Sequence, residues 1–243
     1  MKHYGLIGYP LDHSLSKLLY KTLFLNFKIK ADYQVFAIVP GRFVSDFGDI
    51  LTGVDGINVT MPYKYEVMSY LDIVTPIARN IGNVNVIKKD RGRCIGYNTD
   101  YIGFMYSIKQ YVDRIKGVKA LILGTGGVAK TVAYALKKLG IAYTFVSRTN
   151  KSHDTVLYGE LTPQVVASHR LIVNCTPLGM FPYVSTYPDI PYQAITSEHV
   201  LYDCIYNPIE TQFLQKGRMR SATTINGEKM FFIQAVYALK IWL

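Results

Sequence analysis

A glycine-rich turn between an apolar run and an amphipathic segment constrains this chain more than any other feature. Residues 118–123 form a short, mostly apolar run typical of a buried parallel strand, and apolar side chains then recur at helical spacing from Val132 to Leu139. A strand, a glycine turn and a helix in this order make the first half of a βαβ unit. We therefore expect an α/β fold with a parallel sheet in this part of the chain.

The turn itself matches the pattern G-x-G-x-x-G/A through Gly124, Gly126 and Ala129, with Gly127 and Val128 between them. The small third residue lets the helix pack close to the strand, and backbone N–H groups at the helix start point toward an anion such as a dinucleotide pyrophosphate. Tight turns also need glycine, so the pattern is weak evidence alone and becomes stronger with the strand and helix around it. A phosphate-loop motif is excluded because Ala129 stands where that motif needs glycine.

The residues after the second strand indicate which dinucleotide is bound. Residues 142–146 have the composition of a strand and lead into Ser147, Arg148 and Thr149, with Lys151 close by. Units that bind NAD carry Asp or Glu about 20 residues past the glycines, where it holds the ribose 2′-hydroxyl. A carboxylate repels a 2′-phosphate, whereas a guanidinium binds one through two hydrogen bonds. These residues therefore favour NADP over NAD.

Length and composition limit the class of protein. The 243 residues suffice for one large domain or two ordinary ones, and 49% hydrophobic with 18% charged residues is typical of a globular protein. No uncharged apolar run is long enough to span a bilayer, and the N-terminus leads into a strand pattern without the apolar segment of a signal peptide. We therefore expect no membrane partner and a cytoplasmic location.

The formal net charge of +10 is compatible with several anionic partners. Lys and Arg are scattered, however, and the densest group, residues 88–93, lies between β-type segments and is expected to form the tip of a hairpin. This distribution favours small anionic molecules over nucleic acid.

The cysteines are few and separated. Cys94, Cys175 and Cys204 are odd in number and form no C-x-x-C pair. We expect buried, reduced thiols without a disulfide, and no His or Cys spacing indicates a bound metal.

Three polar residues outside the dinucleotide unit have more than one interpretation. Ser14 stands where a helix is expected to start, so it caps that helix, binds a ligand, or does both. The segment after Pro62 is expected to be a helix with Lys64 in its first turn. The positive end of the helix macrodipole disfavours a cation there by about 0.3–1 kcal/mol, so Lys64 is less expected to be a plain surface residue. Asp100 suits the N-cap of a helix that reaches about residue 111, as well as a role in catalysis.

A series of short motifs runs along nearly the whole chain. They are Gly8-Tyr9-Pro10 with His13-Ser14-Leu15-Ser16, Asn58-Val59-Thr60-Met61-Pro62-Tyr63-Lys64, Asn83-Val84-Asn85, Gly96-Tyr97-Asn98-Thr99-Asp100, the glycine turn, Ser147-Arg148-Thr149, Asn174-Cys175-Thr176-Pro177-Leu178-Gly179-Met180, Tyr202-Asp203-Cys204-Ile205-Tyr206 and Gln234-Ala235. In this order they resemble the shikimate dehydrogenase family. The ordered series is far more specific than any one motif.

The resemblance implies a fold and an activity. The fold has an N-terminal α/β substrate-binding domain over residues 1–101, a Rossmann-type NADP-binding domain over 102–227, and a C-terminal helix over 228–243 that returns to the substrate domain. The implied activity is the NADPH-dependent, reversible reduction of 3-dehydroshikimate to shikimate in aromatic amino-acid biosynthesis. The implied partner is this small substrate, and the implied assembly is a monomer or a homodimer.

The resemblance also implies roles for individual positions. Lys64 and Asp100 form the catalytic pair, in which the ammonium stabilises and protonates the oxygen that gains charge on hydride transfer. Ser14, Ser16 and Tyr206 bind the substrate carboxylate, and Thr60, Asn85, Asp100 and Gln234 bind its hydroxyls. The cofactor-binding residues are Gly124, Gly126, Gly127, Val128, Ala129, Ser147, Arg148, Thr149, Lys151, Cys204 and Gly227.

A few positions depart from the family pattern. Lys17 stands where the family has proline, and Tyr101 replaces the glycine after Asp100. Glu228-Lys229 stands where the family usually has a small or acidic pair beside Gly227. Two alternatives therefore stay open: a dehydrogenase for quinate or another ring hydroxy-acid, and a non-catalytic dinucleotide-binding paralogue.

Overall fold

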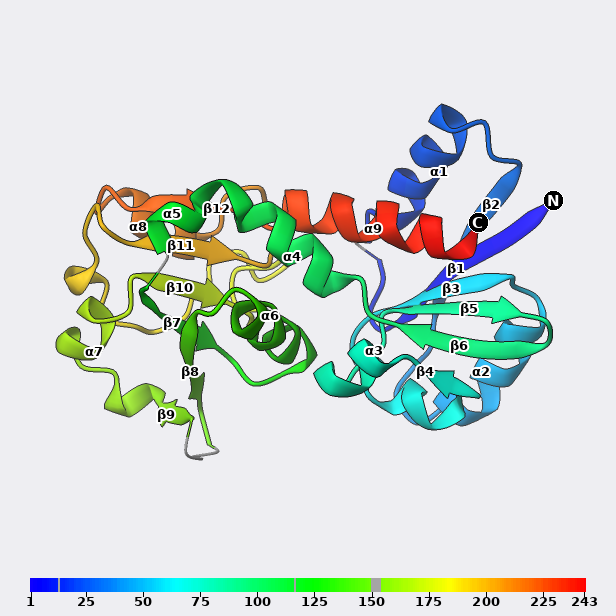
Figure 1. Ribbon diagram of the computed structural model, residues 1–243, viewed down its shortest axis with the longest axis horizontal. Coiled ribbons are helices and arrows are strands. Elements are labelled where there is room, and N and C mark those ends of the chain that lie inside the picture. The colour runs from blue at the N-terminus through cyan, green and yellow to red at the C-terminus, as the bar shows by residue number, and fades with distance from the viewer. Residues whose placement is uncertain (13, 116, 150–153) are drawn as a thin grey trace. The chain divides into compact units, whose positions relative to one another are not determined.

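The computed structural model describes residues 1–12, 14–115, 117–149 and 154–243 and divides into two compact units (Figure 1). Unit 1 comprises Met1–Thr99 together with Gln234–Leu243, and unit 2 comprises Asp100–Ile233. The long helix α9 (Glu228–Trp242) therefore begins in unit 2 and ends in unit 1. The boundaries expected from the sequence, after residues 101 and 227, differ from these by a few residues.

Unit 1 contains a mixed six-stranded sheet with the order β2-β1-β3-β5-β6-β4. Its strands are β1 (Lys2–Gly8), β2 (Ala31–Ala37), β3 (Gly56–Val59), β4 (Ile73–Val74), β5 (Val86–Asp90) and β6 (Arg93–Tyr97). Its other elements are α1 (Ser16–Asn26), α2 (Phe43–Thr52), the 3₁₀ helix η1 (Glu66–Tyr70) and α3 (Pro76–Ile81). Strands β1, β2 and β3 are parallel, whereas β5 and β6 form an antiparallel hairpin in which Asp90 pairs with Arg93. The predicted hairpin tip at residues 88–93 is confirmed.

The C-terminal end of α9 belongs to the core of unit 1. Trp242 stacks on Tyr4 with ring centroids 4.5 Å apart, and its Nε1 donates a hydrogen bond to the Ile87 carbonyl oxygen at 2.9 Å. Gly56 makes room for this contact, because a Cβ atom there would lie 2.4 Å from Trp242 Nε1. The packing of α9 on this sheet thus depends on a glycine in β3.

Unit 2 contains a parallel six-stranded sheet with the order β12-β11-β10-β7-β8-β9. Its strands are β7 (Lys119–Leu123), β8 (Ala142–Ser147), β9 (Thr155–Leu157), β10 (Leu171–Asn174), β11 (Val200–Asp203) and β12 (Thr223–Ile225). Its helices are α4 (Asp100–Ile108), η2 (Lys109–Tyr111), α5 (Val112–Ile115), α6 (Gly127–Lys138), η3 (Tyr158–Glu160), α7 (Pro163–Ala167), η4 (Tyr192–Ala194) and α8 (Gln212–Arg218). Starting the count at β7, this is the doubly wound order 3-2-1-4-5-6 of dinucleotide-binding folds, so the predicted Rossmann-type fold is confirmed.

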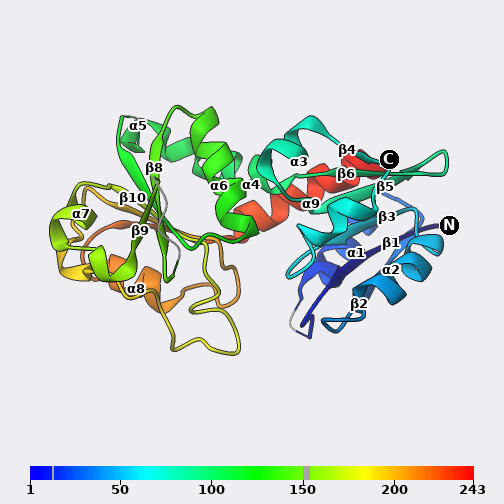
Figure 2. The same ribbon diagram turned by 90° about the horizontal axis from the view of Figure 1, so that it is seen from below.

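The apolar strands of unit 2 bury both of their faces. Ala120 and Ile122 of β7 pack into a core with α4 and α6, whereas Leu121 and Leu123 pack into a second core with α7 and α8. Figure 2 shows α6 and α8 on opposite sides of the sheet. Burial on both faces explains the continuous apolar runs of these strands in the sequence.

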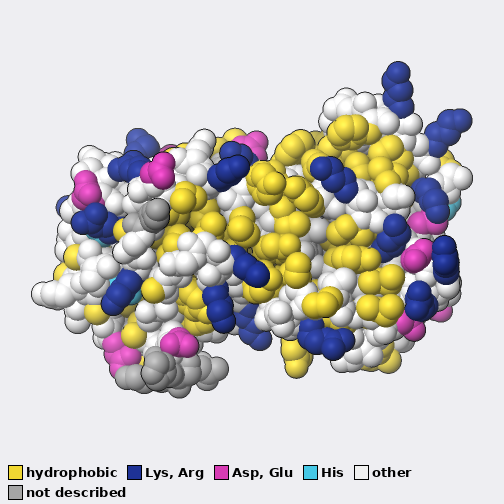
Figure 3. Space-filling model, in the orientation of Figure 1, with side chains coloured by type: hydrophobic (Ala, Val, Ile, Leu, Met, Phe, Trp, Pro, Cys, Tyr) yellow, Lys and Arg dark blue, Asp and Glu magenta, His cyan; other side chains and the backbone are white. Residues whose placement is uncertain are grey.

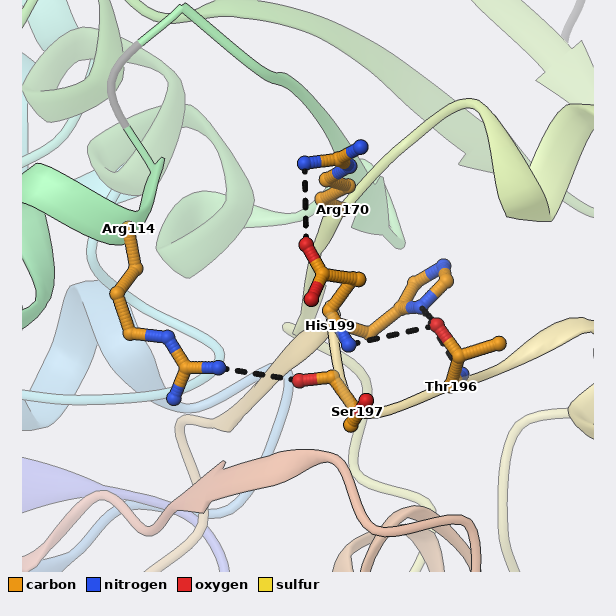
Figure 4. Close-up of polar contacts among 6 residues, drawn as sticks. Arg114, Arg170, Thr196, Ser197 and His199 are labelled. Carbon is orange, nitrogen blue, oxygen red and sulfur yellow. Dashed lines mark hydrogen bonds and ion pairs between the residues drawn. The ribbon is translucent and has the colours of Figure 1, made fainter.

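An ion pair and several hydrogen bonds hold the amino ends of β10 and β11, at the sheet edge opposite the glycine turn (Figure 4). Arg114 Nη2 donates to the Ser197 carbonyl oxygen at 3.0 Å, and Arg170 Nη1 lies 3.4 Å from Glu198 Oε2. His199 Nδ1 accepts a hydrogen bond from the Thr196 backbone N–H at 3.0 Å. These contacts lie at the amino edge of the sheet, away from the carboxyl edge that carries the glycine turn.

The surface agrees with a scattered distribution of basic residues. On the face drawn in Figure 3, Lys and Arg side chains are spread over both units and are not gathered in one patch. No helix in the described part of the chain combines the length and the apolar character needed to cross a bilayer. All three cysteines are free thiols, and each is half-buried, whereas the sequence predicted buried thiols.

Replacing Gly56 by Ala is expected to lower the free energy of unfolding by about 1–3 kcal/mol, because the added methyl group overlaps the Trp242 indole. Gly48→Ala is the matched control, since Gly48 lies in α2 and a Cβ atom there meets nothing within 4 Å. That change is expected to be neutral or stabilising by up to about 1 kcal/mol through helix propensity. Urea unfolding measures both variants, and equal losses would contradict the packing argument.

Candidate active-site residues

The glycine turn of unit 2 has the geometry expected of an anion site. Gly124 adopts a φ of +102°, and its N–H donates to the Val146 carbonyl oxygen at 2.9 Å. Gly126 is the N-cap of α6, and a Cβ atom there would meet nothing within 4 Å, so the start of this helix faces open space. Ala129 is fully buried in the core below, with Val128 packed against the same core. The turn therefore exposes backbone N–H groups at a helix N-terminus, where a pyrophosphate fits.

A cationic side chain follows the neighbouring strand β8. Ser147 is buried at the end of β8, and its Oγ accepts a hydrogen bond from the Thr149 N–H at 3.4 Å. Arg148 and Thr149 are exposed. No carboxylate follows β8 at the position that selects NAD, so this edge fits a 2′-phosphate. Lys151, the fourth residue expected here, lies outside the described residues.

A buried carboxylate organises the carboxyl ends of β10 and β11. Asp203 is 0% exposed and accepts hydrogen bonds from Asn174 Nδ2 (3.1 Å), the Ile205 N–H (3.0 Å) and Thr211 Oγ1 (2.6 Å). Burial raises the pKa of Asp203 to about 6, although the three hydrogen bonds oppose this rise. Asp203 thereby fixes the start of the segment that carries Cys204 and Tyr206.

Tyr206, Cys204 and Asp100 lie near one another within unit 2. Burial raises the pKa of Tyr206 to about 12, with a smaller contribution from the negative charge of Asp100, and the ring stacks on Phe231 at 4.1 Å. The charge of Asp100 also contributes to a raised pKa of Cys204, after the contact with Cys175 and burial. Asp100 is 6% exposed and is the first residue of α4, so it lies inside the first turn, where a carboxylate is favoured, and not at the N-cap position.

Gly227 lies against the same segment. A Cβ atom on Gly227 would be 2.3 Å from the Cys204 carbonyl oxygen, and the Gly227 N–H donates to the Ile205 carbonyl oxygen at 2.9 Å. Any larger residue at this position would displace the backbone beside Cys204. The structure therefore brings together Cys204 and Gly227, two of the residues expected to bind the cofactor.

In unit 1, the start of α1 differs from the prediction. The helix begins at Ser16, the N-cap position is Leu15, and no side chain caps it, so the capping role predicted for Ser14 is wrong. The Ser14 N–H bonds back to the Leu11 carbonyl oxygen, and this turn moves Leu15 into the cap position. Ser14 Oγ instead accepts a hydrogen bond from the Ser16 N–H at 3.3 Å, which places the two serines side by side.

The helix predicted after Pro62 is also wrong. Lys64 lies in a turn between β3 and the short 3₁₀ helix η1, because Tyr63 and Val67 on either side of it are buried in the core. Tyr63 donates from its hydroxyl to the Ile38 carbonyl oxygen at 2.6 Å and stacks on Phe43, and Val67 is fully buried. Without an α-helix at this place, the macrodipole argument for Lys64 does not apply.

The carboxyl ends of β1 and β3 approach closely beside this turn. Thr60 donates its N–H to the Ile7 carbonyl oxygen at 2.9 Å. A Cβ atom on Gly8 would lie 2.3 Å from Thr60 Cγ2 and 2.9 Å from the Met61 carbonyl oxygen. Gly8 therefore allows the strand ends to place Thr60 and the following turn, with the half-buried Lys64, at the edge of the sheet.

A hydrogen-bond cluster connects distant parts of unit 1. Asn85 Nδ2 donates to Thr99 Oγ1 at 3.0 Å and to Gln234 Oε1 at 3.4 Å, and Asn85 Oδ1 accepts from the Thr99 N–H at 2.7 Å. Asn85 precedes β5, which pairs with β3 through Asn58 and Val86. The structure thus brings Asn85 and Gln234 together, although 149 positions separate them in the sequence.

Comparisons with known proteins agree with both units. Residues 6–87 match the family described as the shikimate dehydrogenase substrate binding domain. The shikimate dehydrogenase (NADP(+)) of Carboxydothermus hydrogenoformans is 38% identical, and the alignment covers 98% of this chain and 90% of the relative. The chain belongs to the shikimate dehydrogenase family.

Solved structures support this membership. Shikimate dehydrogenase 1 from Peptoclostridium difficile is 36% identical and superposes with a TM-score of 0.91, covering 100% of this chain and 91% of that chain. Shikimate 5-dehydrogenase from Thermus thermophilus, solved in complex with NADP(H) and shikimate, is 27% identical with a TM-score of 0.87, covering 100% of this chain and 93% of that chain. The alignments leave little of either protein outside the shared fold.

Tyr101, the departure from the shikimate dehydrogenase pattern beside Asp100, is accommodated within unit 2. Its ring makes an edge-to-face contact with Tyr134 of α6, with centroids 5.4 Å apart, and packs against the core. Burial raises the pKa of Tyr101, so its hydroxyl stays protonated at neutral pH. The bulky side chain is thus absorbed by packing between α4 and α6.

Two residues of this family member were missed by sequence reasoning. Tyr158 follows β9, whose Leu157 pairs with Ser147, and its buried hydroxyl has no hydrogen-bond partner among the described residues. Burial raises the pKa of Tyr158 to about 12, and the positive charge of Arg148 lowers it only in part. Cys175 contacts Cys204. Neither the position of Tyr158 beside Arg148 nor the contact of Cys175 with Cys204 can be predicted from a local sequence pattern, since each depends on the pairing of distant strands. No group of three or more metal-binding side chains occurs in the described part of the chain.

Asp203→Asn is expected to change how stability depends on pH. Because the pKa of Asp203 is raised from 3.8 to about 6 in the folded state, wild type loses stability as pH rises between these values, by up to about 3 kcal/mol. Asn does not ionise, so the variant does not lose stability in this way. Relative to wild type, the free energy of unfolding of the variant is therefore expected to rise from pH 4 to pH 7. Urea titrations of both proteins across this range measure the shift, and parallel pH curves would contradict it.

Proposed function

We propose that this protein is an NADP-dependent shikimate dehydrogenase that reduces 3-dehydroshikimate to shikimate reversibly. The main support is the doubly wound sheet of unit 2, whose glycine turn and Arg148 suit NADP. In addition, the shikimate dehydrogenase of Carboxydothermus hydrogenoformans aligns with 98% of the chain. We propose unit 1 as the substrate-binding domain and unit 2 as the NADP-binding domain, with a small-molecule substrate, a cytoplasmic location and a monomeric or homodimeric state.

In this proposal, the carboxyl edge of the unit 2 sheet holds NADP. The N–H groups of Gly126, Gly127, Val128 and Ala129 at the start of α6 bind the pyrophosphate, and the positive φ of Gly124 shapes the turn below them. Arg148, with Ser147, Thr149 and Lys151, binds the 2′-phosphate. Cys204 and Gly227 lie where the nicotinamide is expected. When bound, NADPH supplies the hydride.

The substrate contacts are proposed from paired polar groups. Ser14 and Ser16 lie side by side and offer hydroxyl donors to a carboxylate, together with Tyr206. The pKa of Tyr206 is about 12, so this hydroxyl keeps its proton and can donate throughout the physiological range. Thr60, Asn85, Asp100 and Gln234 bind the ring hydroxyls, and the contact of Asn85 with Gln234 makes a shared subsite for one of them.

Lys64 and Asp100 are proposed to handle the proton. Reduction of a ketone places negative charge on its oxygen, and the Lys64 ammonium stabilises this charge and donates a proton to it. In the reverse direction the amine accepts the hydroxyl proton. The Asp100 carboxylate holds and orients the ammonium, and neither residue forms a covalent bond to the substrate.

Lys64→Ala is expected to lower kcat with shikimate and NADP⁺ by about 10²–10⁴-fold, because the proton donor and acceptor is lost. The rate is followed by nicotinamide absorbance. Lys21→Ala, which removes an exposed lysine of α1, is the matched control and is expected to keep full activity. Full turnover in Lys64→Ala would contradict the proposed role.

The same assay separates the alternatives. Turnover of quinate with a higher kcat/KM than that of shikimate would make the protein a quinate dehydrogenase. Binding of NADP⁺ without turnover of any ring hydroxy-acid would indicate a non-catalytic paralogue. We expect shikimate to be preferred.

Arg148→Ala is expected to raise KM for NADPH about 10–100-fold, since a hydrogen bond to a charged group contributes about 1.5–3 kcal/mol. KM for NADH is expected to change little, because NADH has no 2′-phosphate. Arg148→Lys keeps the charge but loses the two-pronged geometry, so an intermediate KM is expected. Equal changes with NADPH and NADH would rule out recognition of the 2′-phosphate by Arg148.

A further inference from the structure

Two cysteines meet at the carboxyl edge of the unit 2 sheet. Cys175 directly follows β10 and Cys204 directly follows β11, and the last pair in the ladder between these parallel strands is Asn174 with Asp203. The two Sγ atoms are 3.8 Å apart, although 29 positions separate the residues in the sequence. The strand register therefore creates a dithiol that the sequence does not reveal.

The two thiols are not equivalent. The contact with Cys175 and burial raise the pKa of Cys204 well above its ordinary value. Cys204 therefore keeps its proton at neutral pH, with its sulfur 3.8 Å from that of Cys175. Cys175 and Cys204 are both half-buried, so a small oxidant reaches the pair.

We propose that Cys175 and Cys204 form a thiol-oxidation site, which hydrogen peroxide converts into an intramolecular disulfide. The Cys175 sulfur attacks the O–O bond, which breaks to give a sulfenic acid and one water. The Cys204 sulfur then displaces the sulfenic oxygen, which leaves with the Cys204 proton as a second water. Two thiols lose two electrons in total, and one peroxide gains them.

The local geometry allows this bond to form. A disulfide has an S–S distance of about 2.05 Å, so the sulfur atoms must approach by about 1.8 Å. Both cysteines lie one residue beyond the ladder pair, and side-chain rotation brings the sulfurs together while Asn174 and Asp203 stay paired. The disulfide is independent of the proposed function.

The dithiol lies beside two glycines, Gly124 and Gly227, that are proposed to belong to the NADP site. The Cys175 carbonyl oxygen is 3.5 Å from where a Cβ atom of Gly124 would be, and the Cys204 carbonyl oxygen is 2.3 Å from that of Gly227. A disulfide constrains both backbone segments, one against the glycine turn and one against Gly227. Weaker NADP⁺ binding after oxidation follows, and this consequence alone rests on the proposed function.

The test treats the native full-length protein with hydrogen peroxide, then counts free thiols after denaturation and maps linked peptides by mass spectrometry. Free thiols are expected to fall from three to one, with a Cys175–Cys204 linked peptide, and dithiothreitol is expected to restore all three. Cys94→Ser is the matched control and is expected to form the same bond.

Two further variants test the order of steps. Cys204→Ser is expected to hold a sulfenic acid at Cys175, which dimedone labels, whereas Cys175→Ser is expected to leave Cys204 unlabelled. Three surviving thiols in wild type, a disulfide that includes Cys94, or labelling of Cys204 in Cys175→Ser would overturn the proposal. NADP⁺ titration of the reduced protein is a separate measurement, so failure of the disulfide leaves the proposed function testable.

Discussion

Both units depend on backbone segments that approach one another more closely than a Cβ atom allows. Gly8 lies against the Met61 carbonyl oxygen and the Thr60 side chain in unit 1, and Gly227 lies against the Cys204 carbonyl oxygen in unit 2. Neither glycine has a positive φ, so space and not turn geometry requires them. In each unit the close approach joins the carboxyl ends of strands, and these ends carry the polar residues of the candidate site.

Buried hydrogen bonds then orient those residues. Asp203 accepts three hydrogen bonds, one of them from the Ile205 N–H, and so fixes the segment from Cys204 to Tyr206. Asn85 plays a similar part in unit 1, where it bonds both Thr99 and Gln234. A buried polar group without partners costs about 1–3 kcal/mol, so these networks favour one arrangement of the site over looser ones.

Local patterns predicted the dinucleotide unit well, because its strands are apolar on both faces and its turn chemistry lies within one short segment. They failed where tertiary contacts decide the local structure. Tyr63 is tied to Ile38 and Phe43, so the segment of Lys64 forms a turn and not a helix. The contact between Cys175 and Cys204 depends on the register of β10 and β11, which no local pattern determines.

The proposed mechanism requires that Lys64 exchanges the proton at the oxygen that NADPH reduces. A crystal structure of the protein with NADP⁺ and shikimate would show this contact. We expect Lys64 Nζ to lie within about 2.7–3.2 Å of the oxygen on the substrate carbon that is oxidised, and the 2′-phosphate to contact Arg148. Shikimate bound with that oxygen remote from Lys64, or NADP⁺ bound away from the glycine turn, would contradict it.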